Sequence, residues 1–164
     1  MKVIDNFLSS YQFKIVESAM MSPDFPWYFT DGITTIPEPQ RYQFIHGFYS
    51  SPFIPPYIHI KSDRFFLLDL ILQKLDVKKL TRIKANLNPR TLFNIKAGYH
   101  YDYKDIMTAV YYINTNNGWT KFKKGGKVKS VAIRMVIFDS NLEHQGVTCT
   151  DEKRRVVINF NYEV

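Results

Sequence analysis

The chain has one cysteine and no long apolar run, and these shortages exclude several classes of protein. Cys149 alone cannot form an internal disulfide, and it cannot supply a zinc ribbon or a ferredoxin-type cluster. No apolar stretch approaches the roughly 18 residues that span a bilayer, and the first residues lack the apolar segment of a signal peptide. The seven glycines form no phosphate-binding loop. We therefore expect a reduced, cytoplasmic protein with no membrane partner.

The composition indicates a single folded domain. Of the 164 residues, 45% are hydrophobic and 16% are aromatic, which suffices for one packed core. We predict one domain over residues 1–164, in which 1–79 form a helical and irregular support and 80–164 form the β core. The net charge of +7 would suit nucleic acid. The basic residues fall in two separate stretches, 78–84 and 121–129, so we favour a solvated surface.

The first half of the chain predicts two helices with irregular structure between them. Residues 8–21 place apolar side chains at helical spacing, with Ser9 and Ser10 available to cap the helix. Residues 62–75 repeat this pattern with Phe65, Leu68, Leu72 and Leu75 on one stripe. Residues 22–58 hold most of the prolines, and we expect irregular structure there with short strands such as 42–49.

After residue 80 the hydrophobic period changes to two, which is typical of strands. The candidate strands are 81–87, 91–97, 107–114, 120–123, 127–131, 134–138, 144–148 and 155–162. Short strands in this number after a helical opening predict a mainly β protein with flanking helices. We expect a jelly roll, a double-stranded β-helix, with the N-terminal helices packed on one sheet.

Three side chains in the β region form a candidate metal site. His100 and Asp102 are two residues apart, so both face the same way on an extended chain. His144 lies on a later strand, which a jelly roll returns beside the first. Two imidazoles and one carboxylate are the facial ligand set of Fe(II), although Mn, Co, Ni or Zn would also bind such donors. A lone His-x-Asp is more often a structural pair; the second histidine in this order favours a metal.

Arg155 begins the last predicted strand and is a candidate anion-binding residue. It shares a face with Val157, Asn159 and Asn161, whereas Val156 and its alternate neighbours face the opposite side. An arginine inside a barrel needs an anion, because an unpaired buried charge is costly. A structural salt bridge would meet this need as well. Arg154 points to the other side and is the weaker candidate.

Residues 81–162 resemble the Fe(II)- and 2-oxoglutarate-dependent dioxygenases, in particular the prolyl 4-hydroxylase-like branch. The resemblance rests on the His-x-Asp motif at 99–102, the stretches 109–114 and 136–144, and Arg155 at the head of an alternating strand. Residues 3–8 also look like the usual opening of this family. One stretch departs from the pattern: many relatives have a Gly-Gly doublet where this chain has Asn117-Gly118.

The resemblance implies roles for individual residues. Fe(II) would be bound by His100, Asp102 and His144. Arg155 would bind the distal carboxylate of 2-oxoglutarate with Tyr112 as its partner, while Tyr111 packs outward. The weaker candidates to line the co-substrate site, on strands before the metal motif, are Asn86 and Asn94.

The resemblance also implies a reaction. Oxidation of 2-oxoglutarate by O2 to succinate and CO2 would be coupled to hydroxylation of a C–H bond, since Asp102 leaves no ligand position for a halide. The substrate would be a small molecule or a peptidyl residue such as proline, and the protein a monomer or homodimer. Two other functions remain open: a jelly-roll protein that binds a metal or ligand without turnover, and a nucleic-acid dealkylase of the same chemistry.

Overall fold

The alternating segments of the second half form strands that pair antiparallel. The computed structural model describes residues 1–32, 42–51 and 60–164. The strands described are β1 (Lys2–Ile4), β2 (Tyr28–Asp31), β3 (Tyr42–Ser50), β4 (Lys79–Pro89), β5 (Met107–Tyr112), β6 (Trp119–Phe122), β7 (Lys127–Lys129), β8 (Met135–Asp139), β9 (His144–Val147) and β10 (Arg154–Glu163). Most of the strands predicted from the sequence are thereby confirmed, with ends shifted by one or two residues.

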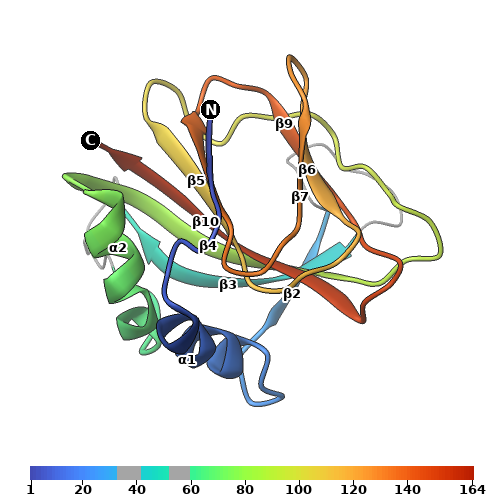
Figure 1. The fold of residues 1–164 in the computed structure, drawn as a ribbon, viewed down its shortest axis with the longest axis horizontal. Coiled ribbons are helices and arrows are strands. Elements are labelled where there is room, and N and C mark those ends of the chain that lie inside the picture. The colour runs from blue at the N-terminus through green and yellow to red at the C-terminus, as the bar shows by residue number, and fades with distance from the viewer. Residues whose placement is uncertain (33–41, 52–59) are drawn as a thin grey trace.

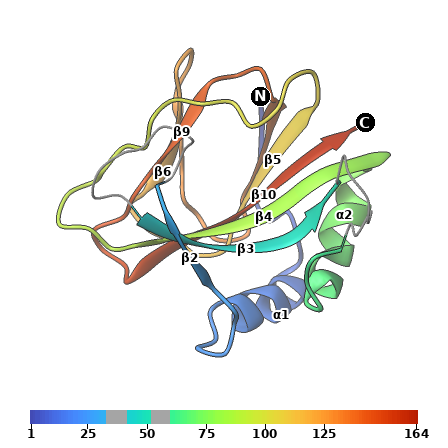
Figure 2. The ribbon, with the colours of Figure 1, turned by 180° about the vertical axis from the view of Figure 1, so that it is seen from behind.

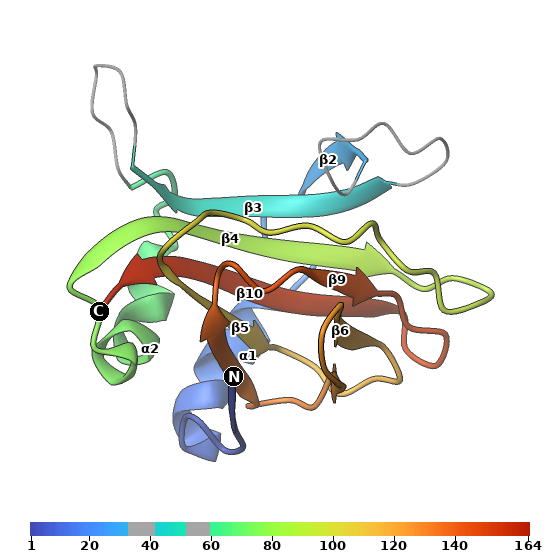
Figure 3. The ribbon, with the colours of Figure 1, turned by 90° about the horizontal axis from the view of Figure 1, so that it is seen from above.

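The strands make two sheets that face each other. The large sheet has the order β1-β8-β5-β10-β4-β3-β2 and the small sheet the order β7-β6-β9. From β5 onward the chain passes to the small sheet, back to β8, across to β9 and back to β10. Figure 3 shows β3, β4 and β10 side by side in the large sheet. This alternation between sheets is the predicted double-stranded β-helix.

The helices cover the face of the large sheet that points away from the small sheet (Figures 1 and 2). Helix α1 (Ser10–Met20) starts with a capping box between Ser9 and Gln12, in which each side chain satisfies a backbone amide of the first turn. The segment predicted as one helix over 62–75 is a 3₁₀ turn, η1 (Phe65–Leu68), followed by α2 (Asp69–Leu75). None of the helices described is long and apolar enough to span a membrane.

Strand β10 lies at the centre of the large sheet, and its two faces have different surroundings. Val156, Ile158, Phe160 and Tyr162 are buried in the core beneath the helices. Arg155, Val157 and Asn159 face the space between the two sheets and line a cavity there. This is the division of faces that the sequence predicts.

The strand predicted at 91–97 is wrong. Only one isolated bridge, between Lys96 and Val147, is formed there. Pro89 ends β4, and the backbone bonds that follow, such as that from Ala97 N–H to the Gly146 carbonyl, form no continuous ladder. Side chains add to them: Ile95 N–H donates to Thr148 Oγ1 at 2.8 Å, and Asn94 Nδ2 donates to the Thr148 carbonyl at 2.7 Å. Strands β1 and β2 were not expected from their sequences, because each is short and lies at an edge of the large sheet.

Adjacent tyrosines on β5 show how sharply the sheet separates its two sides. Tyr111, expected to pack outward, is fully buried beneath α1, where Phe7 and Phe13 meet its ring edge-on. Within the part of the chain that the structure describes, its hydroxyl has no hydrogen-bond partner. Tyr112 is also fully buried, but it faces the small sheet and donates a hydrogen bond to Thr120 Oγ1 at 2.8 Å. The phenol of Tyr112 thus ties the two sheets together.

Removal of the two hydroxyls should have opposite effects on stability. We expect Tyr111→Phe to raise the free energy of unfolding by about 1 kcal/mol, because a buried hydroxyl without a partner is removed. Tyr112→Phe should lower it by about 1 kcal/mol, because Thr120 loses its donor. Urea denaturation followed by circular dichroism measures both. A loss of stability in Tyr111→Phe equal to that in Tyr112→Phe would contradict the assignment.

Candidate functional site

The predicted site residues line a cavity of about 360 Å³ between the two sheets. This volume is within the usual range for a small-molecule site. Strands β4 and β10 form its floor, and β6 and β9 form the opposite wall. Of the residues predicted to form the site, the cavity is lined by Asn86, His100, Asp102, His144 and Arg155.

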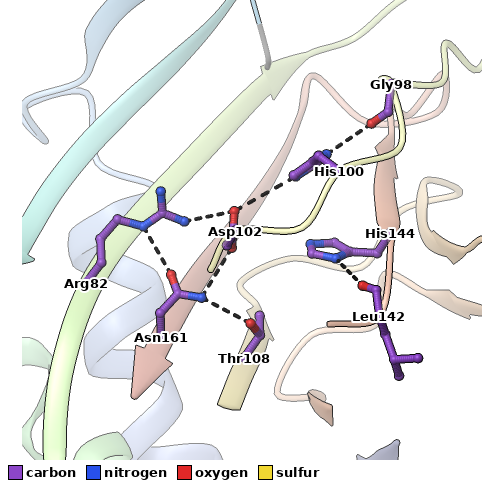
Figure 4. Close-up of polar contacts among 8 residues, drawn as sticks. All are labelled: Arg82, Gly98, His100, Asp102, Thr108, Leu142, His144 and Asn161. Atoms are coloured by element: carbon purple, nitrogen blue, oxygen red, sulfur yellow. Dashed lines mark hydrogen bonds and ion pairs between the residues drawn. The ribbon is translucent and has the colours of Figure 1, made fainter. Parts of the chain in front are cut away.

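The two histidines are brought together by their backbones. His100 and His144 exchange two backbone hydrogen bonds of 3.0 and 2.9 Å, and their ring centroids lie 4.8 Å apart. Each Nδ1 lies beside a carbonyl oxygen, that of Gly98 at 3.0 Å and that of Leu142 at 3.1 Å (Figure 4). A carbonyl only accepts, so Nδ1 is the donor in both contacts, and in the neutral tautomer that makes them the lone pair lies on Nε2. Burial also lowers the pKa of His144, which favours the neutral, metal-binding form.

Asp102 is held by two residues that were not predicted as part of the site. Arg82 Nη2 lies 2.9 Å from Asp102 Oδ1, and Asn161 Nδ2 donates to Asp102 Oδ2 at 3.3 Å (Figure 4). Arg82 Nε in turn donates to Asn161 Oδ1 at 3.1 Å, which closes a ring of three side chains. Burial would raise the pKa of Asp102, but the charges of Arg82, His144 and His100 lower it to about 2. Asp102 is therefore a carboxylate at neutral pH.

The donor types fit a metal ion, although the carboxylate is turned toward Arg82. In the described part of the chain, no three His, Cys, Asp or Glu side chains converge closely enough to hold a metal. His100 Nε2 nevertheless lies 3.9 Å from Asp102 Oδ1. The contact of Arg82 with Asp102 is an ion pair that lacks the alignment of a hydrogen bond. The Asp102 carboxylate would have to turn from Arg82 toward the imidazoles to join them as a ligand.

Arg155 lies at the other end of the floor and is 2% exposed. Its Nε donates to Ser130 Oγ at 2.9 Å and its Nη2 to Thr120 Oγ1 at 3.2 Å. No carboxylate within residues 1–32, 42–51 and 60–164 forms an ion pair with it, so a structural salt bridge does not explain its burial. Burial lowers the pKa of Arg155, yet a guanidinium stays protonated in proteins. An anion bound in the cavity would balance this charge.

The remaining predicted residues divide into two groups. Tyr112 lies beside Arg155, whose guanidinium carbon is 5.7 Å from the centre of the tyrosine ring. Asn86 is 8% exposed and lines the cavity, and its buried Oδ1 has no hydrogen-bond partner in residues 1–32, 42–51 and 60–164. Asn94 is not among the lining residues; it supports the loop after β4 through its bond to Thr148.

Gly118, the retained half of the glycine doublet, makes room for Arg155. A Cβ atom at this position would lie 2.8 Å from Arg155 Cδ and 2.7 Å from the carbonyl oxygen of Val147. Both distances are shorter than van der Waals contact, and the carbonyl belongs to the backbone of β9. Any side chain here would displace the stem of Arg155. One glycine is thus sufficient for the arginine to reach Thr120.

Comparison with known proteins places the fold in a defined class. No family model and no curated protein matches the chain. Among solved structures, a prolyl hydroxylase of Trichoplax adhaerens, in complex with a peptide of the hypoxia inducible factor oxygen degradation domain, is similar with a TM-score of 0.67, at 14% identity, over 99% of this chain and 83% of that one. An oxidoreductase of the 2OG-Fe(II) oxygenase family from Burkholderia pseudomallei also gives 0.67, at 9% identity, over 98% of this chain and 84% of that one.

A prolyl-4-hydroxylase of Pseudomonas putida gives a TM-score of 0.59 at 17% identity, over 99% of this chain and 92% of that one. All three alignments span nearly the whole chain, helices included. At these identities the likeness establishes the fold: this chain has the jelly roll of the 2-oxoglutarate oxygenases and prolyl hydroxylases. The arrangement of His100, Asp102, His144 and Arg155 must be argued on its own chemistry.

The contact between Arg82 and Asp102 should contribute measurably to the stability of the metal-free protein. In Arg82→Met the buried carboxylate loses its cation, so we expect the free energy of unfolding to fall by about 2 kcal/mol. Lys123→Met, which breaks a solvent-exposed ion pair with Glu143, is the control and should change stability little. Urea denaturation in the presence of a chelator measures both. Equal stability of Arg82→Met and the wild type would show that Arg82 does not stabilise Asp102.

Proposed function

We propose that the chain is an Fe(II)- and 2-oxoglutarate-dependent oxygenase that hydroxylates a C–H bond of a substrate and releases succinate and CO2. The observation that carries this proposal is Arg155: a buried cation without a carboxylate partner among the described residues, in the same cavity as two histidines and an aspartate. Such a cavity suits an acid that needs a metal at one end and a cation at the other.

Each residue has a defined task in this proposal. The Nε2 atoms of His100 and His144 and the carboxylate of Asp102 would hold Fe(II), which supplies the activation of O2. The planar fork of Arg155 presents parallel N–H groups to the distal carboxylate of 2-oxoglutarate. The hydroxyl of Thr120 already accepts from both Arg155 and Tyr112, so it fixes the direction of that fork.

The walls of the cavity keep water from the co-substrate. Val110 and Val157 line the cavity between the metal residues and Arg155, and both belong to the core between the two sheets. Apolar walls lower the local dielectric constant, which strengthens the attraction between Arg155 and a bound carboxylate. Arg154, the neighbouring residue, lies on the other side of the sheet and donates to the carbonyl of Met21 at 2.6 Å.

Anaerobic titration with Fe(II) and 2-oxoglutarate tests the proposal. The chelate of the two gives a visible charge-transfer band, which we expect in the wild type and expect to be absent in His100→Ala. Arg155→Met should weaken 2-oxoglutarate binding about 100-fold, because a desolvated charge pair is lost. Arg154→Met is the matched control and should bind as the wild type does.

The result that overturns the proposal is equally clear. If folded wild-type protein with iron in excess gives no band, the chain is not a 2-oxoglutarate oxygenase. A jelly-roll protein that binds another metal or ligand without turnover would then be the better description. Thermal unfolding of each variant shows whether it is folded under the conditions of the titration.

A further inference from the structure

The floor of the cavity contains a row of polar side chains that the proposed reaction does not use. Along β4, the residues Arg82, Lys84, Asn86 and Asn88 line the cavity, whereas the apolar residues between them face the helices. The register pairs Lys84 with Asn159 and Asn86 with Val157 of β10. Paired residues of an antiparallel sheet share a face, so Lys84 and Asn159 lie side by side on the floor.

The three cations of this floor differ in the negatively charged group that lies beside each of them. Arg82 pairs with Asp102 at 2.9 Å. Arg155 faces the co-substrate carboxylate in the proposed function. The side-chain amine of Lys84 forms no hydrogen bond or ion pair with any residue that the structure describes. Desolvation and the charge of Arg82 both lower the pKa of its amine, and Asp102 only partly opposes them, so an anion beside Lys84 would be strongly favoured.

The surroundings of Lys84 can also receive a ligand. The Oδ1 atoms of Asn86 and Asn159 are buried and have no hydrogen-bond partner among the described residues, which leaves two acceptors for N–H or O–H groups. Gly47 of β3 is paired with Lys84 on the other side, and a Cβ atom there would meet nothing within 4 Å. The floor beside Lys84 is therefore open toward β3.

This place is distinct from that of Arg155. Lys84 and Asn88 are four residues apart on β4, which corresponds to roughly 13 Å along a strand, and Asn88 is the partner of Arg155 in the register. The guanidinium of Arg155 is directed to Ser130 and Thr120, on the side of the small sheet. One carboxylate bound by Arg155 in that direction leaves Lys84 without an ion-pair partner among the described residues.

We propose that Lys84, with Asn86 and Asn159, forms a subsite for an anionic group of the primary substrate, a carboxylate or a phosphate. This inference rests on the proposed function, because it assigns Arg155 to the co-substrate. A substrate bound through Lys84 would lie beside Asp102, since Arg82, two residues away on the same face, contacts that carboxylate. The substrate would therefore be an acid, with hydrogen-bond donors near its charged group.

Nuclear relaxation in protein loaded with Mn(II) and 2-oxoglutarate tests the subsite without a known substrate. The probes are inorganic phosphate and acetate, each titrated at constant ionic strength with the protein in excess over Mn(II). We expect the wild type to accelerate the ³¹P or ¹³C relaxation of at least one probe in a saturable manner. The probe that binds more tightly indicates whether the substrate group is a phosphate or a carboxylate.

Three variants give the test its controls. Lys84→Met should weaken binding of the probe at least fivefold, and Lys84→Arg should restore most of it. Lys124→Met removes an exposed lysine of the turn between β6 and β7 and should bind the probe as the wild type does. The affinity for 2-oxoglutarate, measured separately, should be the same in all four proteins.

The remaining outcomes contradict either the subsite or the proposed function. The subsite is overturned if the wild type accelerates the relaxation of neither probe, or if wild type and Lys84→Met accelerate it equally. The oxygenase proposal is unaffected by either result. A loss of 2-oxoglutarate affinity in Lys84→Met also overturns it, because Lys84 then belongs to the co-substrate site. Absence of 2-oxoglutarate binding in the wild type overturns the proposed function instead.

Discussion

The period of two along β10 is the constraint on which the rest of the molecule depends. One set of residues packs in the core between the sheet and the helices: Val156, Ile158, Phe160 and Tyr162. The other set places Arg155, Val157 and Asn159 in the cavity. A register shift of one residue would exchange the two sets and bury Arg155 under α1. The pairing of β10 with both β4 and β5 prevents such a shift, and so fixes the site together with the core.

The cations of the cavity differ in whether a carboxylate contacts them, and this difference indicates where anionic ligands would bind. Three cations, Arg82, Lys84 and Arg155, share a cavity in which Asp102 is the carboxylate that one of them contacts. Folding alone would not select one buried and two partly buried cations, because hydrophobic residues of similar volume would cost less to desolvate. Their position is understandable if the functional state contains further negative charge. A dicarboxylate co-substrate at Arg155 and an acidic substrate at Lys84 would supply it.

The sequence was most informative where one local rule decides the structure. Alternation predicted the faces of β10. His100 and Asp102 both line the cavity, but Tyr101 between them lines it as well and Asp102 lies in a bend, so the alternation of an extended chain does not account for their meeting. Alternation failed at 91–97, where the chain after Pro89 is held to residues 146–149 by scattered backbone bonds and by the side chain of Thr148, without a regular ladder. Short edge strands such as β1 carry too few residues to show a period. The pairing of Arg82 with Asp102 depends on a contact between distant segments, although the alternation of 82–88 already indicated a polar face.

The pairing of Arg82 with Asp102 would keep the proposed metal ligand in place in the absence of the metal. A buried carboxylate without a cation would be costly, and the guanidinium offsets this cost. Because the ion pair is poorly aligned, a divalent ion beside His100 and His144 could take the carboxylate at a small loss. Arg82 would then lose its counter-ion while remaining on the same face of β4 as Lys84. Metal binding would in this way increase the positive charge on the floor where we place the substrate's anionic group.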